Sequence, residues 1–210
     1  MSAAPPAFAT DAATASYYDA RAGEYDDWYL GRGLFAGRNR PGWDQAVADL
    51  VEVVAGLPPA ATLDVACGSG FLTRHLRGPV VGLDQSRSML DLARDRIPGG
   101  RVIRGDALSL ALADDSFERV FTGHLYGHLP GGERAAFIAE ARRVAAELVV
   151  VDSARRPGVE AEQTQERVLN DGSVHRVFKR YRSAAQLAGE IGGDVLADGE
   201  WFVAAHVSWR

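Results

Sequence analysis

Short apolar runs alternate along the chain with segments in which apolar residues recur at helical spacing. The runs are rich in Val, Ile, Leu or Phe, and each is followed by a polar or small residue, which is typical of buried strands. They lie at 62–66, 80–84, 101–105, 119–123 and 148–152. Helical spacing marks 43–55, 86–97 and 132–146, with Ser86 as a suitable N-cap. This alternation predicts parallel strands joined by right-handed crossovers.

The end of the chain departs from this rhythm. Asp171-Gly172 and Asp198-Gly199 each stand between two strand-like runs, which is a hairpin signal. We expect a first hairpin at 166–181, a helix at 183–192, and a second hairpin that closes the sheet with an antiparallel strand. The prediction is an α/β fold whose mostly parallel sheet is covered by helices on both faces.

Length and charge restrict the possible domain organisation and the possible partners. The 210 residues suit one domain, expected at 15–210, behind a small, polar and proline-containing stretch at 1–14 that we expect to be disordered. A net charge of −5 without a basic cluster argues against nucleic acid or a membrane as partner. The N-terminus has no features of a secretory signal. Cys67 is the only cysteine, which fits a cytoplasmic location.

The stretch TLDVACGSGF at 62–71 carries the first sign of chemistry. Gly68 and Gly70 permit positive φ and let the backbone approach a ligand closely. Asp84 ends the second strand, where a carboxylate can accept both hydroxyls of a ribose, and Asp106 follows the third, within reach of an adenine amino group. Ligands of such sheets bind at the carboxyl ends of the strands, so the pattern predicts an adenosine site. The alternative is that the glycines only turn the chain and the aspartates cap helices.

These segments resemble the motifs of class I S-adenosylmethionine-dependent methyltransferases of the small-molecule type. The matching stretches are LDVACGSG, VVGLDQSRSMLDLAR, IRGDALSLALADDSF and RVFTGHLYGHL. The resemblance implies a Rossmann-like three-layer sandwich with a seven-stranded sheet in the order 3-2-1-4-5-7-6, strand 7 being antiparallel. It also implies S-adenosylmethionine as cofactor, S-adenosylhomocysteine as product, and transfer of a methyl group to a small-molecule acceptor by direct in-line displacement.

The same resemblance assigns parts of the cofactor to particular positions. It implies contacts to the methionine end, the ribose, the adenine and the methyl end from Asp64, Ala66, Cys67, Gly68, Ser69, Gly70, Asp84, Gln85, Met89, Asp106, Ala107, Gly123 and His124. Ala66 departs from the commoner GCGTG pattern, but alanine is small enough to keep the binding expectation. For Cys67 we favour a packing role over a reactive thiol, because no base lies nearby in the sequence.

Residues 15–42 hold an unusual density of Tyr and Trp for a segment before the first strand. They resemble the N-terminal segment that closes over cofactor and substrate in small-molecule methyltransferases, with Tyr17 and Tyr25 as the preferred contacts. A lid of this kind would exclude water from an in-line methyl transfer. The alternative is an amphipathic helix whose aromatic rings only pack on the sheet.

The acceptor is expected beyond the fourth strand. His124 and His128 lie there and are candidate bases, since an unperturbed histidine has a pKa near ~6.5; a packing or substrate-shaping role is the alternative. The hairpin at 166–181 is expected to lie over the acceptor site, where Arg167, His175, Arg176 and Arg180 could meet an acidic substrate. Its alternative is a solvated edge hairpin with protective charges. No residue cluster has metal-ligand spacing, so no metal is expected.

Two other functions remain open at this stage. An NAD-dependent oxidoreductase also combines a glycine loop with a ribose-binding acid, but its fingerprint needs a third glycine where this chain has Thr73. A non-catalytic protein that binds S-adenosylmethionine as a regulator is the second, and the aromatic lid weighs against it.

Overall fold

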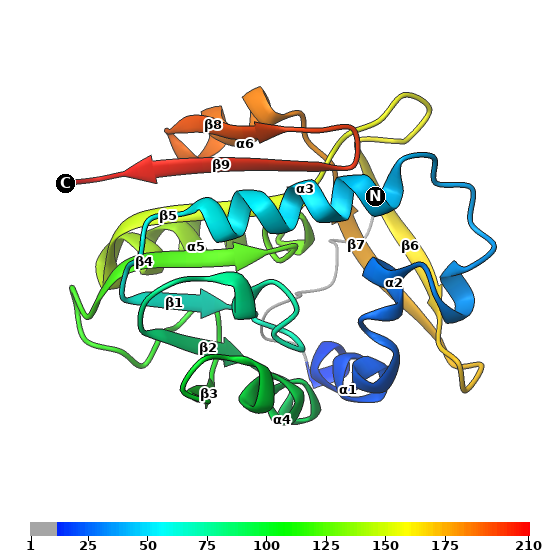
Figure 1. The fold of residues 1–210 in the computed structure, drawn as a ribbon, viewed down its shortest axis with the longest axis horizontal. Helices are drawn as coiled ribbons and strands as arrows, with labels where there is room; N and C mark the ends of the chain where they lie inside the picture. The colour runs from blue at the N-terminus through cyan, green and yellow to red at the C-terminus, as the bar shows by residue number, and fades with distance from the viewer. Residues whose placement is uncertain (1–11) are drawn as a thin grey trace.

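A seven-stranded sheet forms the centre of the computed structural model, which describes residues 12–210 (Figure 1). Its strand order is β3-β2-β1-β4-β5-β9-β8. Neighbouring strands from β3 through β5 are parallel, whereas β9 runs antiparallel to β5. Counted within this sheet alone, the order is the predicted 3-2-1-4-5-7-6. The strands are β1 (Thr62–Val65), β2 (Val80–Asp84), β3 (Val102–Arg104), β4 (Phe117–Gly123), β5 (Ala145–Ser153), β8 (Asp194–Asp198) and β9 (Phe202–Ser208).

Helices cover both faces of this sheet and bury two apolar clusters. α3 (Trp43–Gly56) and α4 (Arg87–Arg96) pack on one face, and α5 (Gly131–Val144) and α6 (Ala184–Ile191) on the other. Successive residues of β5 serve the two clusters in turn: Leu148 belongs to the α5–α6 side and Val149 to the α3–α4 side. This alternation is the pleat of a strand buried on both faces, and it confirms the predicted three-layer sandwich.

The carboxyl edge of the sheet is covered by elements from both ends of the sequence. In Figure 1 the arrows of β1, β2 and β4 point toward the N-terminal helices and a separate two-stranded hairpin. The N-terminal elements are α1 (Ala12–Arg21), α2 (Asp27–Leu30) and the 3₁₀ turns η1 (Ala22–Glu24) and η2 (Gly33–Phe35). The hairpin consists of β6 (Glu162–Val168) and β7 (Val174–Arg180). Two further 3₁₀ turns follow the strands β1 and β4: η3 (Thr73–His75) and η4 (Tyr126–His128).

Some predicted boundaries need correction. The helix expected to reach residue 146 ends at Val144, because Ala145 already pairs with Phe117 of β4. The hairpin begins earlier than expected, since Glu162 pairs with Arg180. Of the stretch 1–14 that was expected to be disordered, 1–11 lie outside the described residues, whereas 12–14 belong to α1. The alanine-rich start of that helix favours the helical conformation. Ser86 caps α4 as predicted, accepting a hydrogen bond from the Met89 N–H.

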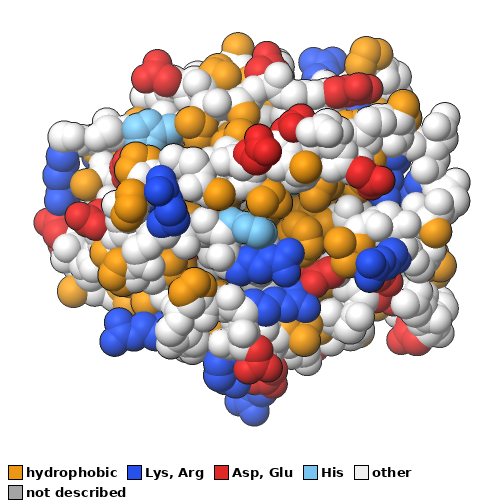
Figure 2. Space-filling model, in the orientation of Figure 1, with side chains coloured by type: hydrophobic (Ala, Val, Ile, Leu, Met, Phe, Trp, Pro, Cys, Tyr) orange, Lys and Arg blue, Asp and Glu red, His pale blue; other side chains and the backbone are white. Residues whose placement is uncertain are grey.

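The outer surface mixes charges of both signs. On the face shown in Figure 2, acidic, basic and apolar side chains are interspersed. No helix among residues 12–210 is both long and apolar enough to cross a membrane.

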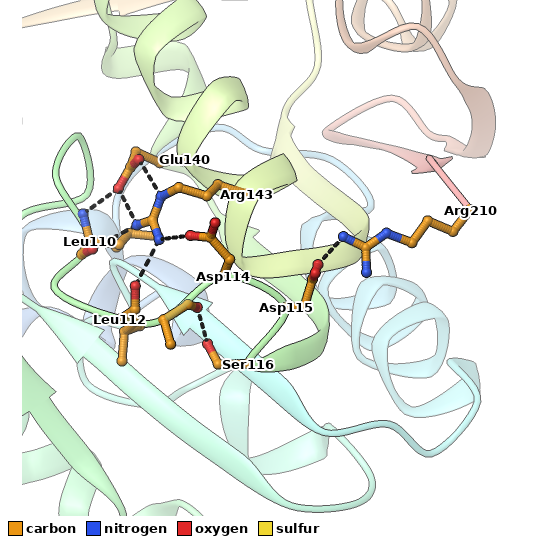
Figure 3. A network of polar contacts seen from close by, with 9 residues as sticks. Leu110, Leu112, Asp114, Asp115, Ser116, Glu140, Arg143 and Arg210 are labelled. Atoms are coloured by element: carbon orange, nitrogen blue, oxygen red, sulfur yellow. Dashed lines mark hydrogen bonds and ion pairs between the residues drawn. The ribbon is translucent and has the colours of Figure 1, made fainter.

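One dense polar network lies where α5 ends and β4 begins (Figure 3). The Arg143 guanidinium binds both carboxylate oxygens of Glu140 and the carboxylate of Asp114. It also donates to the backbone carbonyls of Leu110 and Leu112, so it fastens the segment before β4 to α5. These residues lie at the amino edge of the sheet, away from the carboxyl ends of the parallel strands.

Candidate functional site

The turn after β1 is built from three residues with positive φ. Gly68 and Gly70 have φ of +54° and +78°, as the sequence predicted, and Ala66 has +61°. Ala66 adopts this conformation at a cost of roughly 1 kcal/mol, which a glycine at that position would avoid. Gly70 also packs closely on α4, because a Cβ atom there would lie 3.2 Å from the Ala93 Cα. The turn therefore holds its backbone tightly against the ends of β1 and β2.

Asp84 joins this turn to the end of β2. One carboxylate oxygen accepts the Gly68 N–H at 2.9 Å, and the other accepts the Ser86 N–H at 2.9 Å. Burial raises the pKa of Asp84 to about 6, even though these hydrogen bonds oppose the rise. The carboxylate is thus fixed by two backbone donors from neighbouring loops.

A pocket opens at the carboxyl ends of β1, β2 and β4, and we call it the strand-end pocket. The predicted cofactor residues that line it are Tyr25, Ala66, Gly68, Asp84, Gln85, Ala107, Gly123 and His124. Its free volume is about 40 Å³, smaller than a nucleoside, and the rings of Tyr18 and Tyr25 belong to its wall. Leu125, which the resemblance also implies at the methyl end, lines the pocket too, whereas the sequence missed Tyr18, Leu83 and Gly105.

Several predicted cofactor residues lie behind this wall instead of in it. The Asp64 carboxylate is buried and accepts the Thr73 hydroxyl at 2.5 Å, while its Oδ1 has no hydrogen-bond partner among the described residues. Burial raises the pKa of Asp64 to about 8. The Ser69 hydroxyl donates to Asp26 of the N-terminal segment at 2.5 Å. These hydrogen bonds tie the turn to η3 and to the N-terminal segment.

Cys67, Met89 and Asp106 also lie outside the wall, for reasons of local packing. The Cys67 thiol packs toward Gly82 of β2, where an added Cβ would come within 2.8 Å of its sulfur, in keeping with the packing role favoured above. Met89 belongs to α4, and its side chain is fully buried. Asp106 accepts the Leu108 N–H at 2.8 Å and closes its own loop, while its neighbours on both sides line the pocket.

A second and larger cavity adjoins the strand-end pocket, and we call it the hairpin cavity. Its volume is about 840 Å³, and it shares Tyr18, Tyr25 and His124 with the pocket. β6 contributes its residues 163–168 to the lining, while the N-terminal segment contributes side chains from Tyr17 through Trp43. Tyr17, expected to contact the cofactor, lines this cavity and not the strand-end pocket.

The basic residues of the hairpin are divided between the cavity and its surroundings. Arg167 and Arg176 line the cavity, and Arg176 is exposed. Arg180 instead pairs with Glu162 and Glu190. The His175 ring packs 4.9 Å from the Tyr17 ring. β6 thus lines a cavity, and the position of the acceptor in it stays a prediction.

His124 lies in the wall that both spaces share. Its φ of +67° is unusual for a residue with a side chain, and its N–H donates to the Val151 carbonyl. Neither ring nitrogen has a hydrogen-bond partner among residues 12–210. The Nδ1 atom lies 3.8 Å from a carboxylate oxygen of Asp152, too far for a hydrogen bond. Burial lowers the pKa of His124, although Asp152 opposes this shift, so the ring is neutral at pH 7.

A buried ion pair lies behind His124. The Lys179 ammonium donates to Asp152 Oδ1 at 2.5 Å, and the Gly127 N–H donates to Oδ2 at 2.5 Å. Burial alone would raise the pKa of Asp152, but Lys179 and His124 hold it well below its usual value. His128, the other candidate base, has its Nδ1 2.6 Å from the Phe178 carbonyl and its pKa well lowered by burial and Lys179. His124 is therefore the histidine whose ring nitrogens are left for a ligand.

Parts of this chain are similar to a known domain family and to several known proteins. The methyltransferase domain family matches residues 63–148. The demethylmenaquinone methyltransferase of Thermotoga maritima is 33% identical over 100 residues, which are 45% of this chain and 43% of that protein. A Streptomyces venezuelae dTDP-3-amino-3,4,6-trideoxy-alpha-D-glucopyranose N,N-dimethyltransferase is 36% identical over 87 residues, 39% of this chain and 34% of that protein. The matches thus span less than half the length of these curated relatives.

A solved structure matches over a much larger share of the chain. The structure of a DhpI–SAH complex has a TM-score of 0.69 and 27% sequence identity, and the match covers 93% of this chain and 96% of that one. Residues 63–148 are thus similar to a methyltransferase domain, and the fold of nearly the whole chain is similar to that of a protein solved with SAH.

Proposed function

We propose that this protein transfers a methyl group from S-adenosylmethionine to a small-molecule acceptor by direct in-line displacement, and releases S-adenosylhomocysteine. The observation that carries the proposal is Asp84, whose carboxylate lines the strand-end pocket beside the glycine turn of Gly68 and Gly70. A carboxylate fixed in this way is suited to accept the two hydroxyls of a ribose. Leu83 and Ala107 supply apolar surface for the adenine.

The methionine end of the cofactor has a counterpart in Asp64. Its unpartnered Oδ1 is buried, and a buried carboxylate oxygen without a donor is costly. Because burial raises the pKa of Asp64 to about 8, the group is mostly protonated at pH 7, and an ammonium group brought close to the turn would favour its ionised form and supply the missing partner. We place the methionine ammonium on the Asp64 side of the turn for this reason.

Residues 15–42 act as a lid in this proposal. Two aspartates fasten the segment to the cofactor loops: Asp19 accepts the Ser86 hydroxyl at 2.6 Å, and Asp26 pairs with Arg96 at 2.5 Å. The Tyr25 ring touches the glycine turn, since a Cβ at Gly68 would lie 3.4 Å from it. Tyr18 and Tyr25 belong to the wall of the strand-end pocket, so a movement of these rings would admit the cofactor. Closure afterwards would exclude water from the reacting atoms.

His124 is our proposed base. It borders both the strand-end pocket and the hairpin cavity, which puts it between the expected positions of cofactor and acceptor. A neutral ring can take the proton that an acceptor hydroxyl or ammonium loses as its oxygen or nitrogen bonds to the methyl carbon. The electron pair of the broken carbon–sulfur bond stays on the sulfur. Asp152, held ionised by Lys179, would stabilise the protonated ring.

The site of action proposed is the cytoplasm. Cys67 is the only cysteine of the sequence, and in the structure it is a buried free thiol, which suits a reducing compartment.

Calorimetric titration of the purified protein with S-adenosylmethionine, S-adenosylhomocysteine and NAD tests the cofactor assignment. We expect micromolar dissociation constants for the two sulfur compounds and no heat with NAD. Binding of NAD alone would favour the oxidoreductase alternative and overturn the proposal. Tight binding of S-adenosylmethionine, with no S-adenosylhomocysteine formed across a broad panel of acceptors, would favour the regulator.

A further inference from the structure

Besides the exposed Arg176, five arginine side chains line the hairpin cavity and come from distant parts of the sequence. They come from α1, from the segment after η2, from the loop after β5 and from β6: Arg21, Arg38, Arg40, Arg156 and Arg167. The only carboxylates in the described lining are Glu24 and Glu166. Glu24 is already engaged, because it accepts the Asn170 N–H at 2.7 Å. The cavity is therefore strongly positive, unlike the mixed surface in Figure 2.

None of these five guanidinium groups forms an ion pair with a carboxylate of residues 12–210. They rest instead on aromatic rings and neutral oxygens. Arg40 lies 3.9 Å from the centre of the Trp43 ring, and Arg156 lies 3.7 Å from that of Trp201. Arg167 donates to the side-chain oxygen of Gln165 at 3.0 Å. Such contacts orient a guanidinium without neutralising its charge.

The arginines are also close enough to repel one another. Burial lowers the pKa of Arg38, and the charges of Arg167 and Arg21 lower it further. For Arg40 the causes are burial and then the charge of Arg38. Like charges held together in a concave site destabilise it, and an anion bound among them would relieve the repulsion.

The position of the cluster ties it to the reaction. The cavity shares His124 with the strand-end pocket, and the charge of Arg167 contributes to the lowered pKa of both His124 and His128. A molecule anchored at the arginines would therefore extend toward the histidine proposed as the base. The volume of about 840 Å³ suits a small organic molecule with room to spare.

We propose that the methyl acceptor is a small acidic molecule whose oxyanion group binds the arginine cluster, with Arg38, Arg40 and Arg167 as principal contacts. This inference rests on the proposed methyl transfer and names the chemical class of its acceptor. Guanidinium groups bind carboxylate and phosphoryl oxygens through paired N–H donors, so either anionic group satisfies the site. The anionic group is the anchor, and the atom that receives the methyl group faces His124.

The test uses protein saturated with S-adenosylhomocysteine, so that the cofactor's own carboxylate is already bound. Inorganic phosphate and citrate are the anionic probes, and glycerol is the neutral one. Trp28, Trp43 and Trp201 line the cavity, so tryptophan fluorescence reports occupancy. We expect saturable, salt-sensitive changes with an anion and none with glycerol. The preferred probe, phosphate or citrate, tells which oxyanion the site favours.

Three variants give the test its controls. Arg38→Gln and Arg167→Gln should each weaken the preferred anion about tenfold, as expected for the loss of one charged contact. Arg142→Gln removes the same charge from an exposed position on α5 and should leave the binding of the anion unchanged. Arg38 is exposed, so its variant is expected to fold, and thermal unfolding checks this.

The outcomes separate this inference from the proposed function. Anion affinity equal in wild type and in both cavity variants would overturn it, as would a loss of S-adenosylhomocysteine affinity with anion binding unchanged. If wild-type protein fails to bind S-adenosylhomocysteine at all, the proposed function fails. The same anion titrations without cofactor then still decide whether the arginines form an anion site.

Discussion

Arginine is used in opposite ways at the two edges of the central sheet. At the amino edge, Arg143 is saturated by Glu140, Asp114 and two backbone carbonyls, and its pKa is raised by these partners (Figure 3). At the carboxyl edge, Arg38 and Arg40 have no carboxylate partner among the described residues, and their pKa values are lowered. The charge of Arg143 is thus neutralised within the protein, whereas the charges of Arg38 and Arg40 are not.

The same contrast extends to other polar groups. The unpartnered buried atoms of Asp64 and His124 also belong to the carboxyl edge. A buried polar group normally finds a partner within the protein, so the atoms of Asp64 and His124 favour a ligand there, whereas Arg119 and Arg182, which also have one such atom, each pair with a glutamate. Residues of the amino edge therefore stabilise the fold, whereas those of the carboxyl edge are arranged to bind a ligand. Substitutions at the amino edge should change the thermal stability, and those at the carboxyl edge should change binding or rate.

Removing the Asp84 carboxylate should have the largest effect. Asp84→Ala deletes the proposed acceptor of two ribose hydroxyls, and hydrogen bonds to a charged group contribute about 1.5–3 kcal/mol each. We expect the dissociation constant for S-adenosylhomocysteine to rise at least about 100-fold in calorimetry. Thermal unfolding should stay cooperative. Wild-type affinity in this variant would remove the ribose assignment.

His124→Gln should act on the rate and leave cofactor binding unchanged. Losing a general base lowers kcat by on the order of 10²-fold, and the limb of the pH–rate profile that reports the base should disappear. The affinity for S-adenosylhomocysteine should remain within about twofold of wild type. His75→Gln, in η3 and outside both cavities, is the matched control. An unchanged kcat and pH profile would leave His124 with a packing role.

Cofactor binding should weaken in acid because of Asp84. Its pKa is raised to about 6, so the carboxylate is protonated below that pH and loses acceptor capacity for the ribose. We expect the dissociation constant of S-adenosylhomocysteine to rise about tenfold per pH unit below pH 6. In Asp84→Asn this dependence should vanish. A constant affinity from pH 5 to pH 8 in wild type would contradict the assignment.

Loss of folded protein cannot imitate this effect through Asp84. A carboxyl group with a raised pKa binds its proton more tightly in the folded state, so its contribution to the free energy of unfolding falls as pH rises between its unfolded and folded pKa values. Acid therefore weakens binding through Asp84 while the same group favours folding. Thermal unfolding measured over the same pH range separates the two.

The sheet order was predicted from the family resemblance, whereas the antiparallel closing strand and the position of Asp84 at a strand end were predicted from local signals. A glycine turn, a strand ending in Asp84 and the Asp198-Gly199 hairpin each specify their own conformation. The direction of a side chain could not be predicted from such local signals. Tyr17 was preferred over Tyr18, yet Tyr18 lines the strand-end pocket, because Arg21 and His175 hold the Tyr17 ring in the hairpin cavity. Only the packing of α1 against the hairpin decides this choice.

The arginine cluster was even less accessible from sequence. Arg167 was noticed as a basic residue of the hairpin, but its companions Arg38, Arg40 and Arg156 lie in segments without a recognisable motif. They meet only after the N-terminal segment and the loop behind β5 fold over the same edge of the sheet. No spacing along the chain encodes that meeting.

The amino edge should give the smallest and most selective effect. Arg143→Gln removes hydrogen bonds to two carboxylates and two carbonyls, which tie the segment before β4 to α5. Because the group is exposed to solvent, we expect the Tm to fall by only about 3 °C. The affinities for S-adenosylhomocysteine and for phosphate should stay unchanged. Calorimetric melting and the two titrations are made on one preparation. Weaker anion binding in Arg143→Gln would show that the two edges are coupled and would contradict their separate roles.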